Sequence, residues 1–119
     1  NSDLYGRSFE HWIYTELRAY LHYENVNADL CFWRTSDQKE VDFIIGDRVA
    51  IEVKATKRID QADFKGIKSL KEEGVIKKFV LVSNDPVDRV REDVLCLYWK
   101  TFMIKLWNGE LLADVGRED

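Results

Sequence analysis

The chain has one proline and six glycines among its 119 residues, and it contains no polar repeat. These scarcities exclude the collagen-like, linker and solenoid classes, whose sequences are rich in such residues or repeat at a fixed period. No uncharged run approaches the about 20 apolar residues that a membrane-spanning helix needs. Because 45% of the residues are apolar and 13% are aromatic, one packed core can form. We therefore expect a single soluble domain over residues 1–119, with no membrane partner.

Cysteine is also scarce. Cys31 and Cys96 lie far apart, without the Cys-x-x-Cys spacing or flanking histidines of a zinc or redox site. We interpret them as two reduced, buried thiols. The sparse cysteine usage and the lack of a secretory signal favour the cytoplasm. Because the chain starts at Asn1 and its only methionine is Met103, we expect it to be part of a longer protein.

Basic residues are in the minority, with 18 Lys and Arg against 22 Asp and Glu and a net charge of −4. This sign is unfavourable for a dedicated high-affinity nucleic-acid binder. The segment from Lys54 to Lys78 is locally basic and could meet a phosphate backbone. A solvated helix face has the same pattern, so charge alone leaves both interpretations open.

Hydrophobic periodicity predicts alternating helices and strands. Apolar residues at three- and four-residue spacing indicate helices, and alternating or continuous short apolar runs indicate strands. The predicted elements are a helix over 4–23, strands over 30–35, 40–45 and 49–53, a helix from 60 or 61 to 74, strands over 76–83 and 94–98, and a helix over 100–107. The order predicts one α/β domain with a mixed sheet, and we expect residues 110–119 to be frayed.

The register of the hairpin over 40–54 follows from its alternation. Apolar residues occupy the odd positions on both strands. Odd positions must therefore pair with odd positions, because a slip of one residue would turn the apolar residues of one strand away from the core. We expect all of these odd positions to face one core. Pairing Ile45 with Val49 across the turn then places Asp42 opposite Glu52.

Directly opposed residues have Cβ atoms about 4.5 to 5.5 Å apart, so the carboxylates of Asp42 and Glu52 would repel each other unless a cation is present. Lys54 points to the same face. Such an oxygen-rich group suits a magnesium ion with an ammonium beside it. An ion-pair ladder on a solvated sheet face, in which Lys54 neutralises the carboxylates, is the alternative interpretation of the hairpin.

Glu10 borders the apolar stripe of the first predicted helix. If this helix packs on the sheet that carries Asp42 and Glu52, Glu10 can reach the same ion. A glutamate at such a border can also simply extend to solvent. Glu16 flanks the other side of the stripe.

These residues carry a resemblance to a known family. Segments 6–10 (GRSFE), 40–44 (EVDFI) and 51–54 (IEVK) resemble the motifs of the PD-(D/E)XK nuclease superfamily, and the predicted order agrees with its α-β-β-β-α-β core. With segments 33–35 (WRT) and 65–70 (KGIKSL), nearly the whole chain resembles the uncharacterised C-terminal domain of prokaryotic AAA+ family ATPases. The resemblance implies an α/β restriction-endonuclease-like fold, in which helices flank a mixed central sheet.

The resemblance also implies Mg²⁺-dependent hydrolysis of phosphodiester bonds in nucleic acid, with DNA as the expected substrate and Mn²⁺ as an alternative ion. Asp42 and Glu52 would coordinate the ion together with the backbone carbonyl of Val53. Lys54 would position or help to activate the attacking water. Glu10 would bind a second ion or an ordered metal-bound water.

The family pattern is not matched at every position. The superfamily often has proline before the first aspartate, where this chain has Val41. Glu16 matches a glutamate of the ATPase-associated family, and its role stays open between metal contact and helix support. The resemblance further implies an ATPase module in the same protein and a homodimer that cuts both strands.

No second constellation of catalytic residues competes with this one. The sequence has no phosphate-binding Gly-x-x-x-x-Gly-Lys-Ser/Thr loop, and His11 and His22 are too far apart on one helix to share a metal ion. The four tryptophans could stack on bases, but large aromatic residues are more often found in a core or an interface. A catalytically silent module that gives an ATPase its partner specificity therefore remains the alternative to a nuclease.

Overall fold

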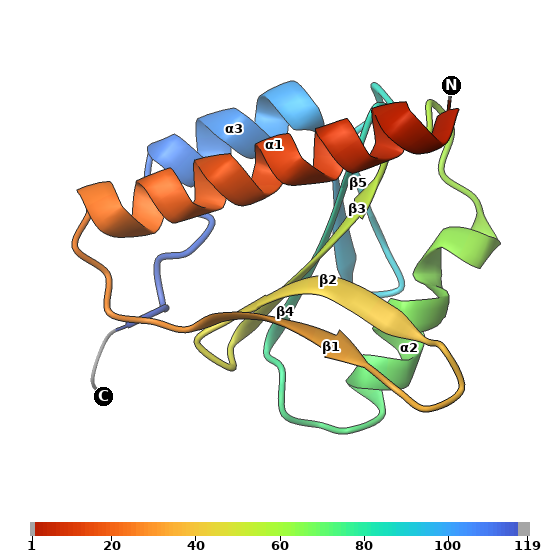
Figure 1. Ribbon diagram of the computed structural model, residues 1–119, viewed down its shortest axis with the longest axis horizontal. Coiled ribbons are helices and arrows are strands. Elements are labelled where there is room, and N and C mark those ends of the chain that lie inside the picture. Colours follow the sequence, from red (N-terminus) through yellow and green to blue (C-terminus); the bar gives the residue numbers. More distant parts are fainter. Residues whose placement is uncertain (1, 117–119) are drawn as a thin grey trace.

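The computed structural model describes residues 2–116, and side chains from Leu4 onwards. It confirms the predicted α/β class, because a mixed sheet of six strands is flanked by three helices (Figure 1). The elements are α1 (Ser2–Tyr23), β1 (Leu30–Arg34), β2 (Glu40–Ile45), β3 (Val49–Lys54), a 3-10 turn (Gln61–Phe64), α2 (Lys65–Lys71), β4 (Lys78–Ser83), β5 (Arg89–Arg91), β6 (Val94–Tyr98) and α3 (Trp99–Trp107).

The strand order is β1-β2-β3-β4-β6-β5. The meander β1-β2-β3 is antiparallel, whereas β3, β4 and β6 run parallel. The parallel strands are joined through helical or looped crossovers, as parallel pairing requires. Strand β4 lies inside the sheet and is buried along both faces, as its continuous apolar run predicts.

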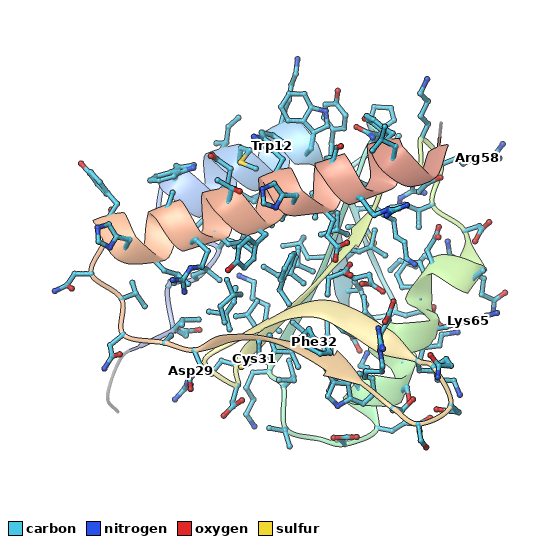
Figure 2. All side chains as sticks on the ribbon, in the orientation of Figure 1. Trp12, Asp29, Cys31, Phe32, Arg58 and Lys65 are labelled. Atoms are coloured by element: carbon cyan, nitrogen blue, oxygen red, sulfur yellow. The ribbon has the colours of Figure 1, made fainter. Side chains whose placement is uncertain are left out.

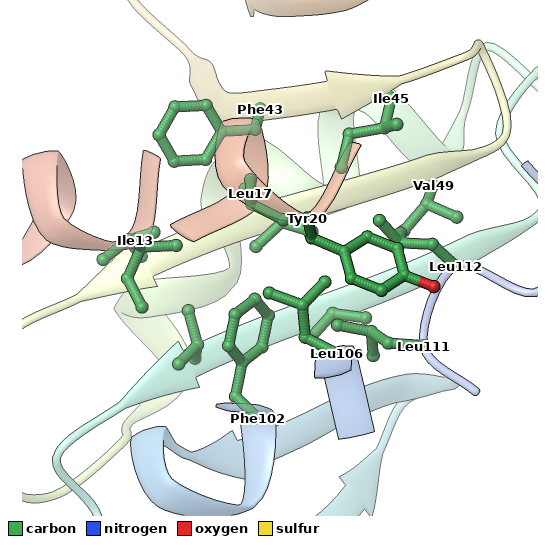
Figure 3. Close-up of a cluster of buried hydrophobic side chains, with 14 of the residues drawn as sticks. Ile13, Leu17, Tyr20, Phe43, Ile45, Val49, Phe102, Leu106, Leu111 and Leu112 are labelled. Carbon is green, nitrogen blue, oxygen red and sulfur yellow. The ribbon is translucent and has the colours of Figure 1, made fainter. Parts of the chain in front are cut away.

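Both faces of the sheet carry a hydrophobic core. Helices α1 and α3 cover one face, and α2 covers the other (Figure 1). Odd-numbered residues of the hairpin from Phe43 to Val53 face α1 and α3, whereas Ile44 and Ala50 face α2. Figure 3 labels the core beneath α1 and α3: Ile13, Leu17, Tyr20, Phe43, Ile45, Val49, Phe102, Leu106, Leu111 and Leu112. The expectation that the odd positions face one core is therefore confirmed for all of them except Val41, and the second core on the other face of the hairpin was not predicted.

The predicted pairing of the hairpin is confirmed next to the turn, but the ladder of paired residues ends sooner than predicted. Ile45 pairs with Val49 and Phe43 with Ile51, but no paired residues follow. Between β1 and β2 the register shifts, so that Asp42 and Phe43 of β2 together oppose one residue of β1. This β-bulge turns Val41 to the α2 side, although the strict alternation predicted that Val41 faces the same core as Phe43 and Ile45.

Three further expectations need correction. Strand β5, which pairs with β6, was not predicted, because its three residues Arg89–Arg91 alternate charged and apolar side chains on a sheet edge. Residues 111–116 are not frayed, since Leu111, Leu112 and Val115 are buried in the core under α1, while residues 117–119 lie outside the described part. Of the two thiols, Cys96 is buried as expected and Cys31 is exposed.

None of the helices in residues 2–116 combines the length and apolar character that crossing a bilayer requires.

Candidate functional site

One open cleft of about 730 Å³ contains all four side chains that the sequence singled out. Glu10 reaches it from α1, Asp42 from β2, and Glu52 and Lys54 from β3. We call Glu10, Asp42 and Glu52 the carboxyl cluster. The predicted meeting of residues from α1 and the hairpin is therefore present in the structure.

Asp42 and Glu52 bridge the two strands where the backbone ladder ends. The Asp42 backbone N–H donates to Glu52 Oε1 at 3.2 Å, and the Val53 backbone N–H donates to Asp42 Oδ2 at 2.7 Å. Each carboxyl group thus accepts a hydrogen bond from a backbone N–H of the opposite strand, in place of the carbonyl oxygen that a continued ladder would supply. This exchange holds the two carboxyl groups together at the strand ends, although their residues are not a ladder pair.

The carboxyl cluster favours protonated forms. Burial, with hydrogen-bonding and charge contributions from Asp42, raises the pKa of Glu10 from 4.5 to about 7. Burial, with hydrogen-bonding and charge contributions from Glu52, raises the pKa of Asp42 from 3.8 to about 8. Burial also raises the pKa of Glu52, which is only 4% exposed. The cluster therefore holds protons near neutral pH, as crowded acids do in the absence of sufficient positive charge.

Lys54 supplies the nearest positive charge. Its Nζ lies 4.0 Å from Glu52 Oε2, and the side chain is partly exposed towards the cleft. This ammonium lowers the pKa of both glutamates in the cluster, but less than burial raises it. The ion-pair ladder considered for the hairpin is thus only partly realised, because one ammonium faces three carboxyl groups.

The donor set of the cluster fits a hard divalent cation in its chemistry. Carboxylate oxygens, with a backbone carbonyl such as that of Val53 beside them, are the ligands that Mg²⁺ accepts. Among residues 2–116, however, no three or more His, Cys, Asp or Glu side chains stand in an arrangement that could hold a metal ion. Glu10 lies beside Asp42, and Asp42 beside Glu52, close enough for a hydrogen bond when one member of a pair is protonated. Metal binding would have to replace the shared protons and separate these pairs.

Cations surround the cluster on the walls of the cleft. Lys39 is neutralised by Asp37, with 2.8 Å between Nζ and Oδ2. Within the described residues, neither Arg7 of α1 nor Lys65 of α2 forms an ion pair, and both line the cleft. Two cations without an ion-pair partner in the described part of the chain thus line the cleft, one from α1 and one from α2.

Gly66 allows the beginning of α2, which carries Lys65, to approach β2. A Cβ atom at Gly66 would lie 1.9 Å from the carbonyl oxygen of Glu40, a separation that no side chain tolerates. The beginning of α2 therefore packs directly on the backbone of β2. This close approach places Lys65 at the cleft (Figure 2).

Residues 5–102 match the family described as Domain of unknown function (DUF4143). The chain belongs to this family. Domains of the family are found in the C-terminal regions of AAA ATPases. The matched part includes α1, the hairpin, α2 and β4, and hence the whole candidate site of this DUF4143 domain. No curated protein and no solved structure matches the chain.

Glu16 does not belong to the carboxyl cluster of this DUF4143 domain. The Trp107 indole Nε1–H donates to Glu16 Oε1 at 3.1 Å, which ties α1 to α3. Of the two roles left open for Glu16, the structure supports helix packing. The tryptophans take part in packing as well, since the ring of Trp12 meets Trp99 edge-on and that of Trp107 meets Tyr20.

Sequence reasoning did not assign roles to Arg7, Lys65 or Phe32. Arg7 and Lys65 were visible within the motif-like segments, but only the packing of α1 and α2 shows that they face one cleft. Phe32 is 70% exposed in the middle of the edge strand β1. An exposed aromatic residue cannot be distinguished from a buried one by residue type alone.

Proposed function

We propose that this DUF4143 domain is a Mg²⁺-dependent phosphodiesterase that hydrolyses nucleic acid, with DNA as its substrate and Mn²⁺ as an alternative ion. One observation carries the proposal. Three carboxyl groups from α1, β2 and β3 meet beside the Lys54 ammonium in an open cleft, where Arg7 and Lys65 lack ion-pair partners among the described residues. A domain used only for packing has no physical need to crowd acids in this way.

Each residue has a role in this chemistry. Asp42, Glu52 and the Val53 carbonyl would hold the ion, and Glu10 would hold a second ion or a metal-bound water. When bound, the ion would neutralise the carboxylates and polarise the phosphate. Lys54, at the inner wall of the cleft, would orient the attacking water and stabilise negative charge that develops on the phosphate oxygens.

The proposal extends to the setting of the domain. The motif resemblance to PD-(D/E)XK nucleases supports the same residue roles in a restriction-endonuclease-like fold. We propose that the domain acts with an ATPase module of the same protein in the cytoplasm, and that two copies act together to cut both strands. The occurrence of the family in AAA ATPases supports the first of these points.

A catalytically silent module of an AAA+ ATPase is the second candidate function. It is favoured by the use of Asp42 and Glu52 as acceptors for backbone amides, a structural role that needs no metal. The lack of a metal-holding arrangement among residues 2–116 and the net charge of −4 point the same way. In this case the domain would bind a protein partner without cleaving nucleic acid.

Calorimetric titration with Mg²⁺ and Mn²⁺, combined with a plasmid-nicking assay, distinguishes the two functions. The test variant is Asp42→Asn, which removes one carboxylate and preserves the shape of the side chain. Asp37→Asn is the matched control, because Asp37 lines the same cleft but is exposed and paired with Lys39. We expect Asp42→Asn alone to abolish nicking and weaken metal binding. A wild-type protein that binds neither ion at millimolar concentration would contradict the nuclease proposal.

A further inference from the structure

A second hollow, of about 430 Å³, adjoins the carboxyl cluster on the side of β1. It is lined by Phe32, Arg34, Val41 and Phe43, and it shares Glu10, Glu40 and Asp42 with the cleft described above. The three shared residues therefore stand between two hollows of different character. The first is lined by cations together with acids, and the second contains aromatic rings.

Phe32 is the prominent side chain of this second hollow. It lies on β1 opposite the bulged pair Asp42 and Phe43, so the bulge brings it beside the cluster. Its side chain is 70% exposed, an unfavourable position for a ring with no polar atom (Figure 2). The guanidinium carbon of Arg34 lies over the ring at 6.0 Å from its centroid, and this guanidinium is ion-paired with Glu40 at 3.0 Å. An exposed aromatic ring with an arginine beside it is an arrangement on which nucleobases stack.

We propose that the site binds single-stranded nucleic acid, with an unpaired base stacked on Phe32 while the adjoining phosphate lies at the carboxyl cluster. This inference rests on the proposed function and narrows its substrate to an unpaired strand, so that two copies cutting both strands would each engage one strand of a locally opened duplex. Arg7 and Lys65 in the first hollow would contact the neighbouring phosphates. The volume of the second hollow falls within the about 300–1,000 Å³ of typical ligand sites.

Two features favour a single strand over a duplex. Bases within a duplex are stacked on their neighbours, so their faces are not available to Phe32, whereas unpaired bases can be splayed onto an aromatic ring. The domain carries a net charge of −4, and six acidic and four basic side chains line the cleft, so charge gives the backbone of a duplex little attraction. Stacking would supply affinity that charge does not.

Fluorescence anisotropy with a labelled single strand of about 15 nucleotides tests this inference, since sites of this type span about 4–16 nucleotides. The duplex of the same sequence serves as the second probe. Ca²⁺ replaces Mg²⁺ in both measurements, which keeps a divalent cation available to the carboxyl cluster while removing the ion proposed for cleavage. The variants are Phe32→Ala and Phe32→Trp. Val90→Ala is the matched control, because Val90 is also 70% exposed on an edge strand, β5, at the opposite end of the sheet.

We expect Phe32→Ala to weaken single-strand binding by about 5- to 150-fold, the range that loss of one base–aromatic stack produces. Phe32→Trp should preserve binding, and Val90→Ala should leave it within about twofold of wild type. Duplex binding should be weaker than single-strand binding and insensitive to Phe32. The inference would be overturned if Phe32→Ala kept the single-strand affinity of wild type, or if Val90→Ala lost as much of this affinity as Phe32→Ala. It would also be overturned if the wild-type domain did not bind the single strand at protein concentrations up to about 100 µM.

The same samples separate this inference from the proposed function. If Phe32-dependent binding occurs but no preparation cleaves with Mg²⁺ or Mn²⁺, the proposed function fails and the binding assignment stands. If the domain cleaves and Phe32→Ala cleaves single strands as well as wild type, the inference fails and the nuclease stands. Sedimentation analysis adds a further outcome: loss of a dimer in Phe32→Ala with unchanged nucleic-acid binding would assign Phe32 to a protein contact and overturn the inference.

Discussion

Neutralising Asp42 should stabilise the domain in the absence of metal. In Asp42→Asn the amide oxygen can still accept from the Val53 N–H, and the amide nitrogen can donate to Glu52, so the variant imitates protonated aspartic acid. The variant cannot acquire the negative charge that its crowded surroundings oppose. The sign of the effect thus tests whether the acids of the cluster are held together against their repulsion.

The magnitude follows from the pKa of Asp42. Folding raises this pKa from 3.8 to about 8, so the folded protein keeps a proton that the unfolded chain releases above about pH 4. Wild-type stability therefore falls as the pH rises from about 4 to about 8, and the loss is complete above the folded pKa. About four pKa units set an upper limit of about 6 kcal/mol. Because Asp42 shares protons with Glu10 and Glu52, we expect a gain of about 2 to 3 kcal/mol in the variant at pH 8.

Urea unfolding followed by tryptophan fluorescence in EDTA measures this gain at about pH 5 and about pH 8. The gain should be smaller at the lower pH, where less of the penalty has developed. Asp37→Asn should show no gain at pH 8, because contacts with Lys39 and Thr35 lower the pKa of Asp37 to about 2 and its ionised form is the stabilised one. A gain in Asp42→Asn that does not depend on pH, or a loss of stability at pH 8, would refute the reasoning.

Three further predictions follow from the site. Mg²⁺ affinity should rise as the pH increases through about 7 to 8, because the cluster must release the protons that it holds at pKa values of about 7 and 8. Calorimetry in two buffers of different ionisation enthalpy measures the number of protons released on binding. A Mg²⁺ affinity that does not change with pH would contradict this prediction. Lys54→Met should lower nicking by about 100-fold or more while metal binding persists, and normal nicking would exclude the role assigned to Lys54. Gly66→Ala should destabilise the domain by about 2 to 3 kcal/mol in urea unfolding, because its Cβ would collide with the backbone of β2. Gly6→Ala, with open space around the added methyl group, should instead stabilise α1 by up to about 1 kcal/mol, and equal effects of the two substitutions would contradict the packing described.

Local pattern was sufficient to predict most elements of the fold. The apolar spacing of α1 and the alternation of β2 and β3 depend on neighbouring residues in the chain, and they specified these elements and the pairing of Ile45 with Val49. The same pattern predicted that Asp42 and Glu52 would lie close together, with Glu10 within reach. These acids are positioned by the faces of their own helix and strands, so sequence reasoning could find them.

Other features depend on contacts between distant segments. The bulge of β2 exists only in its pairing with β1, and it redirects Val41 to the α2 side and places Phe32 beside the cluster. The buried segment 111–116 is held by the core beneath α1, which the sequence near the end of the chain does not reveal. Strand β5 forms because β6 offers a free edge, not because of its own β-propensity.

The sequence by itself determined the α/β class, the chemical identity of the acidic and basic groups, and the face that each occupies on its own element. Only the tertiary structure decided that Arg7, Lys65 and Phe32 share the surroundings of the carboxyl cluster and that its acids retain protons. The physical reason is that periodicity reports where a side chain points within one element. Burial, charge repulsion and exposure instead depend on which elements pack together, and they are properties of the assembled sheet and helices.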